Sequence, residues 1–200
     1  MRYREGVLRC QRLVLGLLLL LTAGPRAQTS APAGLPPLPF EDIGACPFEG
    51  CSYREWIARE SVQIRRDRAS SSPVVFELAA GEVVTAVTGT VVTVVPGILR
   101  VSTPVTLESL YGVLAVSPQD TVYLLTYEGE GFYKAWFRGR LHTGVDVGQI
   151  TGGGCRVAAD CAGRIVAEPT MVWWVQVRNA KGQVGWTDRP ELFDNKDALA

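Results

Sequence analysis

Histidine is almost absent from this sequence of 200 residues, in which His142 is the only one. A catalytic zinc ion usually takes about three protein ligands, among which histidine is prominent. Nucleophilic serine or cysteine generally needs a histidine as base, and the sequence has no Gly-x-Ser-x-Gly turn to present a serine. We therefore expect no catalytic residues, no metal site and no cofactor. We interpret His142 as a strand-surface residue among aromatic side chains.

Helical periodicity is also missing. After the N-terminal region, no segment keeps an apolar period of 3.6 residues over three turns, and short runs rich in valine, threonine and aromatic residues alternate instead. The chain is therefore expected to be all-β, with only short helical turns such as one near residues 189–193.

The chain has only one long hydrophobic run, Leu13 to Leu21, which is too short to span a bilayer. It follows an arginine-rich segment and precedes small, turn-forming residues, which is the layout of a secretory signal peptide. We predict a signal peptide over residues 1–27, a secreted or periplasmic location and no membrane span after cleavage. An uncleaved anchor is the alternative.

An excess of positive charge is lacking as well. Removal of residues 1–27 takes away five of the 20 basic residues and one of the 20 acidic residues, so 15 and 19 remain and the net charge is −4. A mildly acidic domain without a basic stripe has no general attraction to nucleic acid or to anionic lipid. We therefore expect no nucleic-acid partner.

Four cysteines remain after export, and an even number in an oxidising compartment favours disulfides. Three connectivities are open, and the short spacings favour the local pairs Cys46 with Cys51 and Cys155 with Cys161. Each pair would mainly fix the shape of a small loop, because a short loop gains little from closure. A four-cysteine zinc site is the rival interpretation, although neither spacing is the two-residue one usual for zinc.

The clearest strand pattern lies near the C-terminus. Residues 173–178 alternate, residues 179–182 supply a turn that ends in Gly182, and Val184 and Trp186 resume the alternation, which predicts a β-hairpin. Because neighbours on a strand point to opposite faces, Trp173 and Trp174 cannot share one core. One of them must be covered by another part of the chain or left for a partner.

Two segments resemble the halves of a bacterial SH3-like (SH3b) domain. The run VQIRRDRASSSPVVFELAAGEVVTAV resembles its opening half, with a polar loop that ends near Ser-Pro-Val and a Leu-x-x-Gly-Glu turn, and WWVQVRNAKGQVGW resembles its closing half. Together with GACPFEGCSYREW and LLTYEGEGFYKAWFRGRL, these segments are similar to uncharacterised secreted SH3-domain-containing proteins of bacteria.

This resemblance implies an SH3-like β domain over residues 41–195, preceded by a proline-rich linker over residues 28–40 and followed by a tail over residues 196–200. Its halves would be residues 61–87 and 173–187. In an ordinary member the halves nearly touch, whereas here a β-rich insertion over residues 88–172 separates them. Two tandem small barrels are the alternative architecture.

The resemblance also implies a function in binding, since SH3-like domains of bacteria are thought to contact cell-wall peptide or glycan through an aromatic groove. The candidate side chains are four aromatic ones and two acids at the groove rim that could meet a cationic or amide group: Trp174, Trp136, Tyr133, Tyr127, Glu128 and Glu130. The extra strands of the insertion could instead cover Trp174 and leave it in a core.

Two other functions stay open at this point. An accessory protein of the cell envelope could use its exposed strand edges to bind another protein. A glycan hydrolase could use Glu128 and Glu130 as its carboxylate pair, but both acids lie on one exposed turn, where facing each other across a bond is difficult. We favour the binding module, with peptidoglycan or an envelope protein as its partner.

Overall fold

The computed structural model describes residues 34–152, 155 and 160–199. The predicted signal peptide and the first part of the predicted linker lie outside the described residues. Within these ranges the fold is all-β, as the sequence predicts, with three sheets and two 3-10 helices, η1 (Gly148–Ile150) and η3 (Pro190–Leu192). The second of these is the helical turn expected near residues 189–193.

The largest sheet has eight strands in the order β15-β2-β5-β13-β14-β3-β4, with β1 paired to β5 as well. Its members come from the beginning and the end of the described chain. They are β1 (Phe40–Ile43), β2 (Glu55–Ala58), β3 (Val62–Arg65), β4 (Val74–Leu78), β5 (Val83–Val95), β13 (Thr170–Arg178), β14 (Val184–Thr187) and β15 (Phe193–Asp194).

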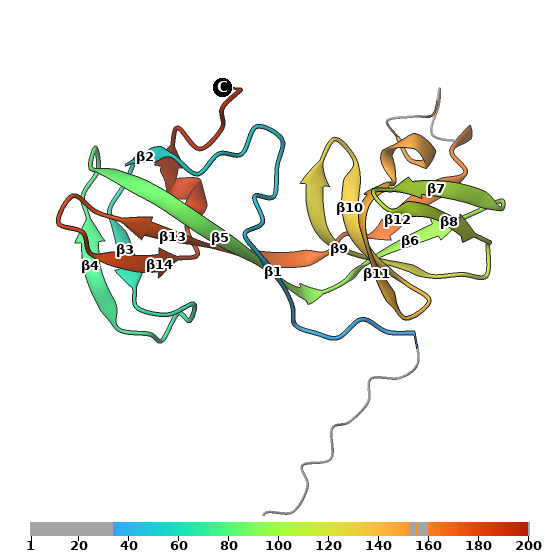
Figure 1. Ribbon diagram of the computed structural model, residues 1–200, viewed down its shortest axis with the longest axis horizontal. Coiled ribbons are helices and arrows are strands. Elements are labelled where there is room, and N and C mark those ends of the chain that lie inside the picture. The colour runs from blue at the N-terminus through green and yellow to red at the C-terminus, as the bar shows by residue number, and fades with distance from the viewer. Residues whose placement is uncertain (1–33, 153–154, 156–159, 200) are drawn as a thin grey trace, which may run out of the picture. The chain divides into compact units, whose positions relative to one another are not determined.

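The other two sheets contain only strands that lie between β5 and β13 in the sequence. A five-stranded sheet has the order β11-β10-β9-β6-β12, and β7 and β8 form a two-stranded sheet (Figure 1). The strands are β6 (Gly97–Val101), β7 (Val105–Ser109), β8 (Gly112–Val116), β9 (Val122–Gly129), β10 (Phe132–Phe137), β11 (Arg140–Asp146) and β12 (Gly163–Ala167). All seven strands lie within the β-rich insertion expected over residues 88–172.

The pairing of β5 with β13 joins segments far apart in the sequence. The two strands are antiparallel from Thr170 beside Val95 to Arg178 beside Thr85, and they lie side by side in Figure 1. Strand β5 is 13 residues long because its valines and threonines continue beyond Val87, where the sequence suggested a break. The expected SH3-like halves therefore contribute neighbouring strands to a single sheet.

The buried side chains form two clusters, one for each of the larger sheets. The cluster of the eight-stranded sheet is centred on Trp56 and Phe193, both fully buried, with ring centroids 5.7 Å apart. The other cluster lies under the five-stranded sheet and includes Leu99, Leu124 and Tyr133. Each of the two larger sheets thus packs on its own apolar core.

The hairpin predicted over residues 173–186 is present as β13 and β14. The Asn179 side-chain oxygen accepts hydrogen bonds from the amides of Lys181 and Gln183, both at 3.0 Å, and Gly182 has φ +78°. A left-handed φ of this kind favours glycine, which explains why this residue closes the turn.

Both predicted disulfides are present, with Cα–Cα distances of 5.6 Å for Cys46–Cys51 and 5.3 Å for Cys155–Cys161. This pairing leaves no thiolate for the zinc alternative. Residues of the predicted tail lie beside the first disulfide: Cys51 and Asp197 form an antiparallel bridge, and Ala198 N–H donates to the Gly50 carbonyl at 2.7 Å.

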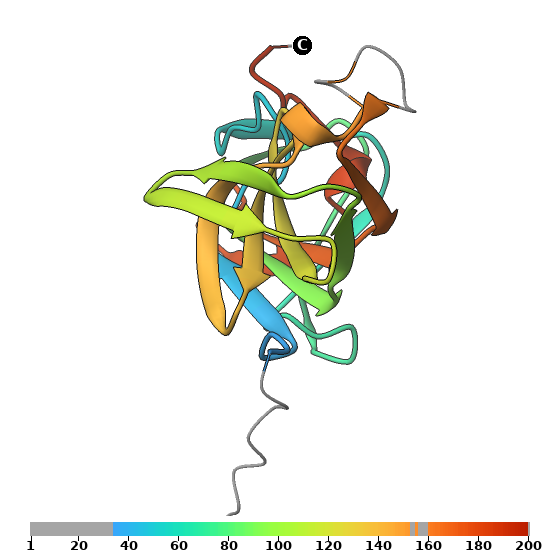
Figure 2. The ribbon, with the colours of Figure 1, turned by 90° about the vertical axis from the view of Figure 1, so that its right-hand side faces the viewer.

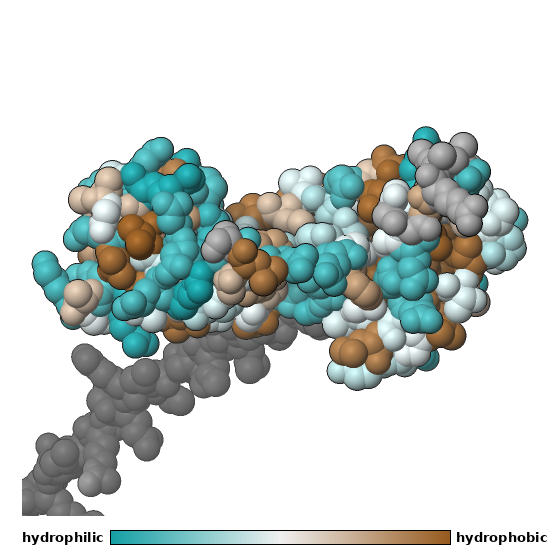
Figure 3. Space-filling view, turned by 90° about the horizontal axis from the view of Figure 1, so that it is seen from above, coloured by the Kyte–Doolittle hydropathy of each residue, from teal (hydrophilic) through white to brown (hydrophobic). Residues whose placement is uncertain are grey.

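The surface of the described chain mixes polar and apolar residues. On the face seen from above in Figure 3, hydrophobic residues are interspersed with hydrophilic ones. Among the described residues, no helix has the length and apolar character needed to cross a membrane.

Candidate functional site

The six side chains predicted to bind a ligand do not form one groove. Tyr127, Tyr133 and Glu130 line one cavity, and Glu128 and Glu130 line a second. Trp136 and Trp174 line neither of these cavities. The candidate site is therefore the cavity that is lined by both tyrosines.

Trp174 is buried rather than open to a ligand. It lies opposite Thr90 of β5 and is only 7 % exposed. Its neighbour Trp173 points to the other face of β13 and packs edge-on against Trp56, with ring centroids 5.8 Å apart. The expectation that Trp174 offers a ring face to a ligand is therefore corrected, because the chain itself covers it.

Trp136 lies on the face of β10 opposite that of Tyr133, as the alternating burial along this strand shows. Its cross-strand neighbours are Tyr123 and Leu141. The indole N–H of Trp136 is buried and has no hydrogen-bond partner among the described residues. Trp136 and Tyr133 therefore cannot act on the same ligand group.

The cavity that holds the two tyrosines, which we call the tyrosine pocket, has a volume of about 610 Å³. It lies between the turn from β9 to β10, the helix η1, the end of β12 and the start of β13. Its lining consists of Tyr127, Glu130, Gly131, Tyr133, Gly148, Thr151, Ile165, Glu168, Pro169 and Met171. Apolar and aromatic walls with two carboxylates make this pocket suited to a ligand with both an apolar and a cationic part.

The two tyrosines are fixed by their strands. Tyr127 of β9 and Tyr133 of β10 are cross-strand partners, and their rings meet edge to face with centroids 5.1 Å apart and an interplanar angle of 62°. The Tyr127 hydroxyl accepts a hydrogen bond from Gly131 N–H at 3.4 Å. This pair is a rigid aromatic wall, which costs little conformational entropy when a ligand binds.

Tyr133 is a hydrogen-bond donor inside the pocket. Its hydroxyl donates to a carboxylate oxygen of Glu168 at 3.5 Å, and the residue is only 7 % exposed. Burial, followed by the negative charge of Glu168, raises the pKa of Tyr133 to about 12. The hydroxyl therefore keeps its proton, and with it the hydrogen bond to Glu168, to a higher pH than an exposed tyrosine would.

The turn between β9 and β10 places Glu130 at the rim of the pocket. Three successive residues have positive φ: +99° at Gly129, +48° at Glu130 and +85° at Gly131. The two glycines adopt this conformation easily, and Glu130 is exposed at the tip between them. The acidic, glycine-rich tip expected from the sequence is thus a defined left-handed turn.

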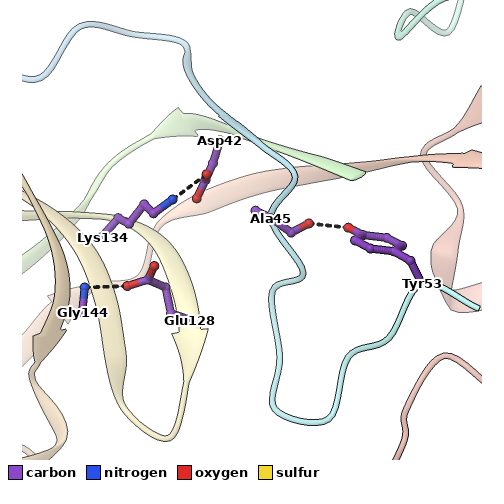
Figure 4. Close-up of polar contacts among 6 residues, drawn as sticks. All are labelled: Asp42, Ala45, Tyr53, Glu128, Lys134 and Gly144. Atoms are coloured by element: carbon purple, nitrogen blue, oxygen red, sulfur yellow. Dashed lines mark hydrogen bonds and ion pairs between the residues drawn. The ribbon is translucent and has the colours of Figure 1, made fainter. Parts of the chain in front are cut away.

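Glu128 faces the second cavity, which has a volume of about 490 Å³. Its carboxylate accepts a hydrogen bond from Gly144 N–H of β11 at 2.8 Å (Figure 4). Glu128 and Glu130 share this cavity, but only Glu130 also reaches the tyrosine pocket. Glu128 therefore does not belong to the tyrosine pocket.

The one histidine of the sequence does not lie in a group of metal-binding side chains among the described residues. His142 is a partly buried residue of β11, and its ring centroid is 6.5 Å from that of Phe137. Within residues 34–152, 155 and 160–199, no group of three or more histidine, cysteine, aspartate or glutamate side chains is arranged to hold a metal ion.

Polar contacts position the first strand next to the five-stranded sheet. The Lys134 ammonium of β10 lies 2.6 Å from a carboxylate oxygen of Asp42 in β1 (Figure 4). The Tyr53 hydroxyl donates a hydrogen bond to the Ala45 carbonyl. These bonds hold the segment between β1 and β2, which includes the first disulfide loop, close to the turn at Gly129.

Sequence reasoning missed the pocket residues Glu168, Pro169 and Met171, because they lie at the end of the expected insertion and before the hairpin predicted from residue 173. A usable signal was present: Glu168 precedes a proline, so its backbone is biased toward an extended conformation. It also lies only five residues before Trp173, where the predicted hairpin begins. The start of β13 lines the same pocket as Gly131. This placement depends on the long-range pairing of β13 with β5, which no local pattern reveals.

No family model matches this chain, and searches among curated proteins and among solved structures give no match either.

Proposed function

We propose that this chain is an exported, non-enzymatic binding module of the SH3-like kind, whose tyrosine pocket binds an amine-bearing group of cell-wall peptide or glycan. One observation carries the proposal. The rings of Tyr127 and Tyr133 line a single cavity together with the carboxylates of Glu130 and Glu168.

The chemistry of this pocket matches an amine attached to an apolar stem. Two carboxylates attract a protonated amine, and no described basic side chain lines the pocket to neutralise them. A cation close to an aromatic face gains about 0.5–2 kcal/mol, depending on how far it is desolvated. Ile165 and Met171 supply apolar contact for the carbon chain that carries the amine.

Export is part of the proposal. The N-terminal layout is typical of a signal peptide, and the disulfides Cys46–Cys51 and Cys155–Cys161 suit an oxidising compartment. A protein outside the cytoplasm meets cell-wall polymer directly, and the peptides of that polymer carry free amines on diamino acids.

A pull-down on purified peptidoglycan tests this proposal. We expect the wild type to be retained and Tyr127→Ala to be lost into the supernatant, because the substitution removes half of the aromatic wall. Ile43→Ala is the control, since Ile43 is 77 % exposed and lies outside both the tyrosine pocket and the second cavity. Circular dichroism must show that both variants are folded. Equal retention of wild type and Tyr127→Ala would reject the pocket as the binding site.

The same assay separates the two ligand sources. Glycan strands from which an amidase has removed the peptides lack the diamino acid. We expect binding to intact peptidoglycan and loss of binding to the stripped strands. Binding of equal strength to both would move the proposed ligand from the peptide to the glycan.

A further inference from the structure

The turn of the β7–β8 hairpin exposes three apolar side chains, which we call the hairpin tip. Leu110 is 63 % exposed, Tyr111 87 % and Val113 67 %. The strands behind the tip are anchored normally, since Leu107 and Leu114 are buried in the core of the five-stranded sheet. Single exposed apolar residues are common, but three within four positions make this turn a candidate interaction surface.

The hairpin tip is held in a fixed place. Leu110 N–H donates to the Thr143 carbonyl of β11 at 2.9 Å, and the Ser109 hydroxyl donates to the Gly112 carbonyl at 2.8 Å. Figure 2 shows this hairpin at the front of the view, facing outward. A surface that is already ordered loses little entropy on binding, so its exposed area is available for affinity.

The surroundings of the hairpin tip are acidic. The second cavity, of about 490 Å³, is lined by Leu110 and by four glutamates, namely Glu49, Glu108, Glu128 and Glu130. None of these carboxylates forms an ion pair with another described residue, and Lys134, the lysine of the neighbouring strand β10, is already paired with Asp42. The apolar tip therefore stands beside four carboxylates that no described ion pair neutralises.

This charge decides between the possible occupants. An anionic membrane surface or a nucleic acid would be repelled by the four carboxylates. A second copy of this chain would bring the same carboxylates opposite each other. A protein segment with basic side chains next to apolar ones would cover the hairpin tip and place its cations toward the cavity.

We propose that the hairpin tip is a docking surface for a partner protein segment in which lysine or arginine alternates with apolar residues. No residue of the hairpin tip lines the tyrosine pocket, and the second cavity shares only Glu130 with that pocket. The proposal stands or falls independently of cell-wall binding.

A titration of the ¹⁵N-labelled protein with three synthetic peptides tests the proposal. The probe is a capped hexapeptide of alternating leucine and lysine, and the controls replace lysine by glutamate or leucine by serine. We expect the Leu–Lys peptide alone to shift the amide signals of Glu108, Leu110 and Tyr111. The double variant Leu110→Ser with Tyr111→Ser should weaken this binding at least tenfold, and Glu108→Gln should weaken it at least twofold. Val94→Ser, at an exposed site of β5, should leave it unchanged.

Several outcomes would overturn the proposal. These are binding of the glutamate peptide as tight as that of the lysine peptide, unchanged affinity of the double variant, or no shift with any peptide up to millimolar concentration. Dimerisation of the wild type that the double variant abolishes would assign the hairpin tip to a second copy. Flotation with anionic vesicles that the double variant abolishes would assign it to a membrane. Either result would reject a protein segment as the occupant of the hairpin tip.

Discussion

The ammonium of Lys134 in β10 lies 2.6 Å from one carboxylate oxygen of Asp42 in β1, so an ion pair ties the first strand to the five-stranded sheet. Asp42 is only 6 % exposed, and its second carboxylate oxygen has no hydrogen-bond partner among the described residues. Lys134 is therefore the main compensation for a buried negative charge.

Loss of this lysine should destabilise the fold. Lys134→Met keeps the length of the side chain but leaves the Asp42 carboxylate buried and unpaired, so we expect the free energy of unfolding to fall by about 1–3 kcal/mol. Urea denaturation measures the change. The double variant Asp42→Asn with Lys134→Met should recover most of the loss, because neither charge then remains. A single variant as stable as the wild type would show that the ion pair contributes nothing.

Gly89 in β5 is required by close packing rather than by its backbone angles. A Cβ atom at this position would lie 2.1 Å from the Tyr53 hydroxyl and 2.5 Å from the indole nitrogen of Trp173. Gly89→Ala should therefore force these side chains apart and lower stability by about 1–3 kcal/mol. Gly152→Ala is the control, since no atom of another described residue lies within 4 Å of its added Cβ. Equal melting temperatures for the two variants would contradict this interpretation.

The raised pKa of Tyr133 predicts a loss of stability in alkali. Below pH 10 the tyrosine is neutral in both the folded and the unfolded state. Between pH 10 and about pH 12 the unfolded chain releases this proton while the folded chain retains it, so folding becomes less favourable as pH rises. The contribution lost by pH 11 is about 1 kcal/mol.

Urea denaturation at pH 9, 10 and 11 checks this prediction by comparing the wild type with Tyr133→Phe. The phenylalanine variant keeps the ring and cannot ionise, so its stability should fall less steeply with pH. Identical slopes for the two proteins would mean that Tyr133 has an ordinary pKa.

The disulfide Cys46–Cys51 should act locally. A bridge that closes so short a loop contributes about 2 kcal/mol in the chain-entropy model, so replacing both cysteines by serine should cost about that much. The C-terminal segment should also loosen, because Ser52 N–H donates to the Lys196 carbonyl at 2.9 Å. Hydrogen exchange should then accelerate at the amides of Ser52 and Ala198. If exchange is unchanged at both amides, the disulfide does not hold this segment.

Local patterns predicted much of the fold. The hairpin around Gly182 and the two disulfides depend on residues close together in the sequence, so alternation, turn chemistry and spacing were sufficient to predict them. The all-β class followed from the absence of helical periodicity. Extending β5 as far as Val95 required knowledge of its partner β13, because a long strand is stabilised by the pairing as well as by its own residues.

The candidate site was predictable only in part. Tyr127, Tyr133 and Glu130 were found because they stand close together around one turn. Trp174 was predicted to line the groove, but it is buried. Its cross-strand neighbour is Thr90 of β5, which is far away in the sequence. Met171 reaches the pocket through the pairing of β13 with β5, and Glu168 lies in the connection between β12 and β13. No pattern near either residue indicates a ligand.

Calorimetric titration of the protein with a soluble stem peptide that carries one free side-chain amine is the most direct test of the tyrosine pocket. The same peptide with that amine acetylated is the matched ligand, and Glu168→Gln is the matched variant because it removes the charge and keeps the shape. We predict that the wild type binds the free amine at least tenfold more tightly than the acetylated form, and that Glu168→Gln loses this preference. Equal affinity of the wild type for the two peptides would contradict an amine-binding pocket.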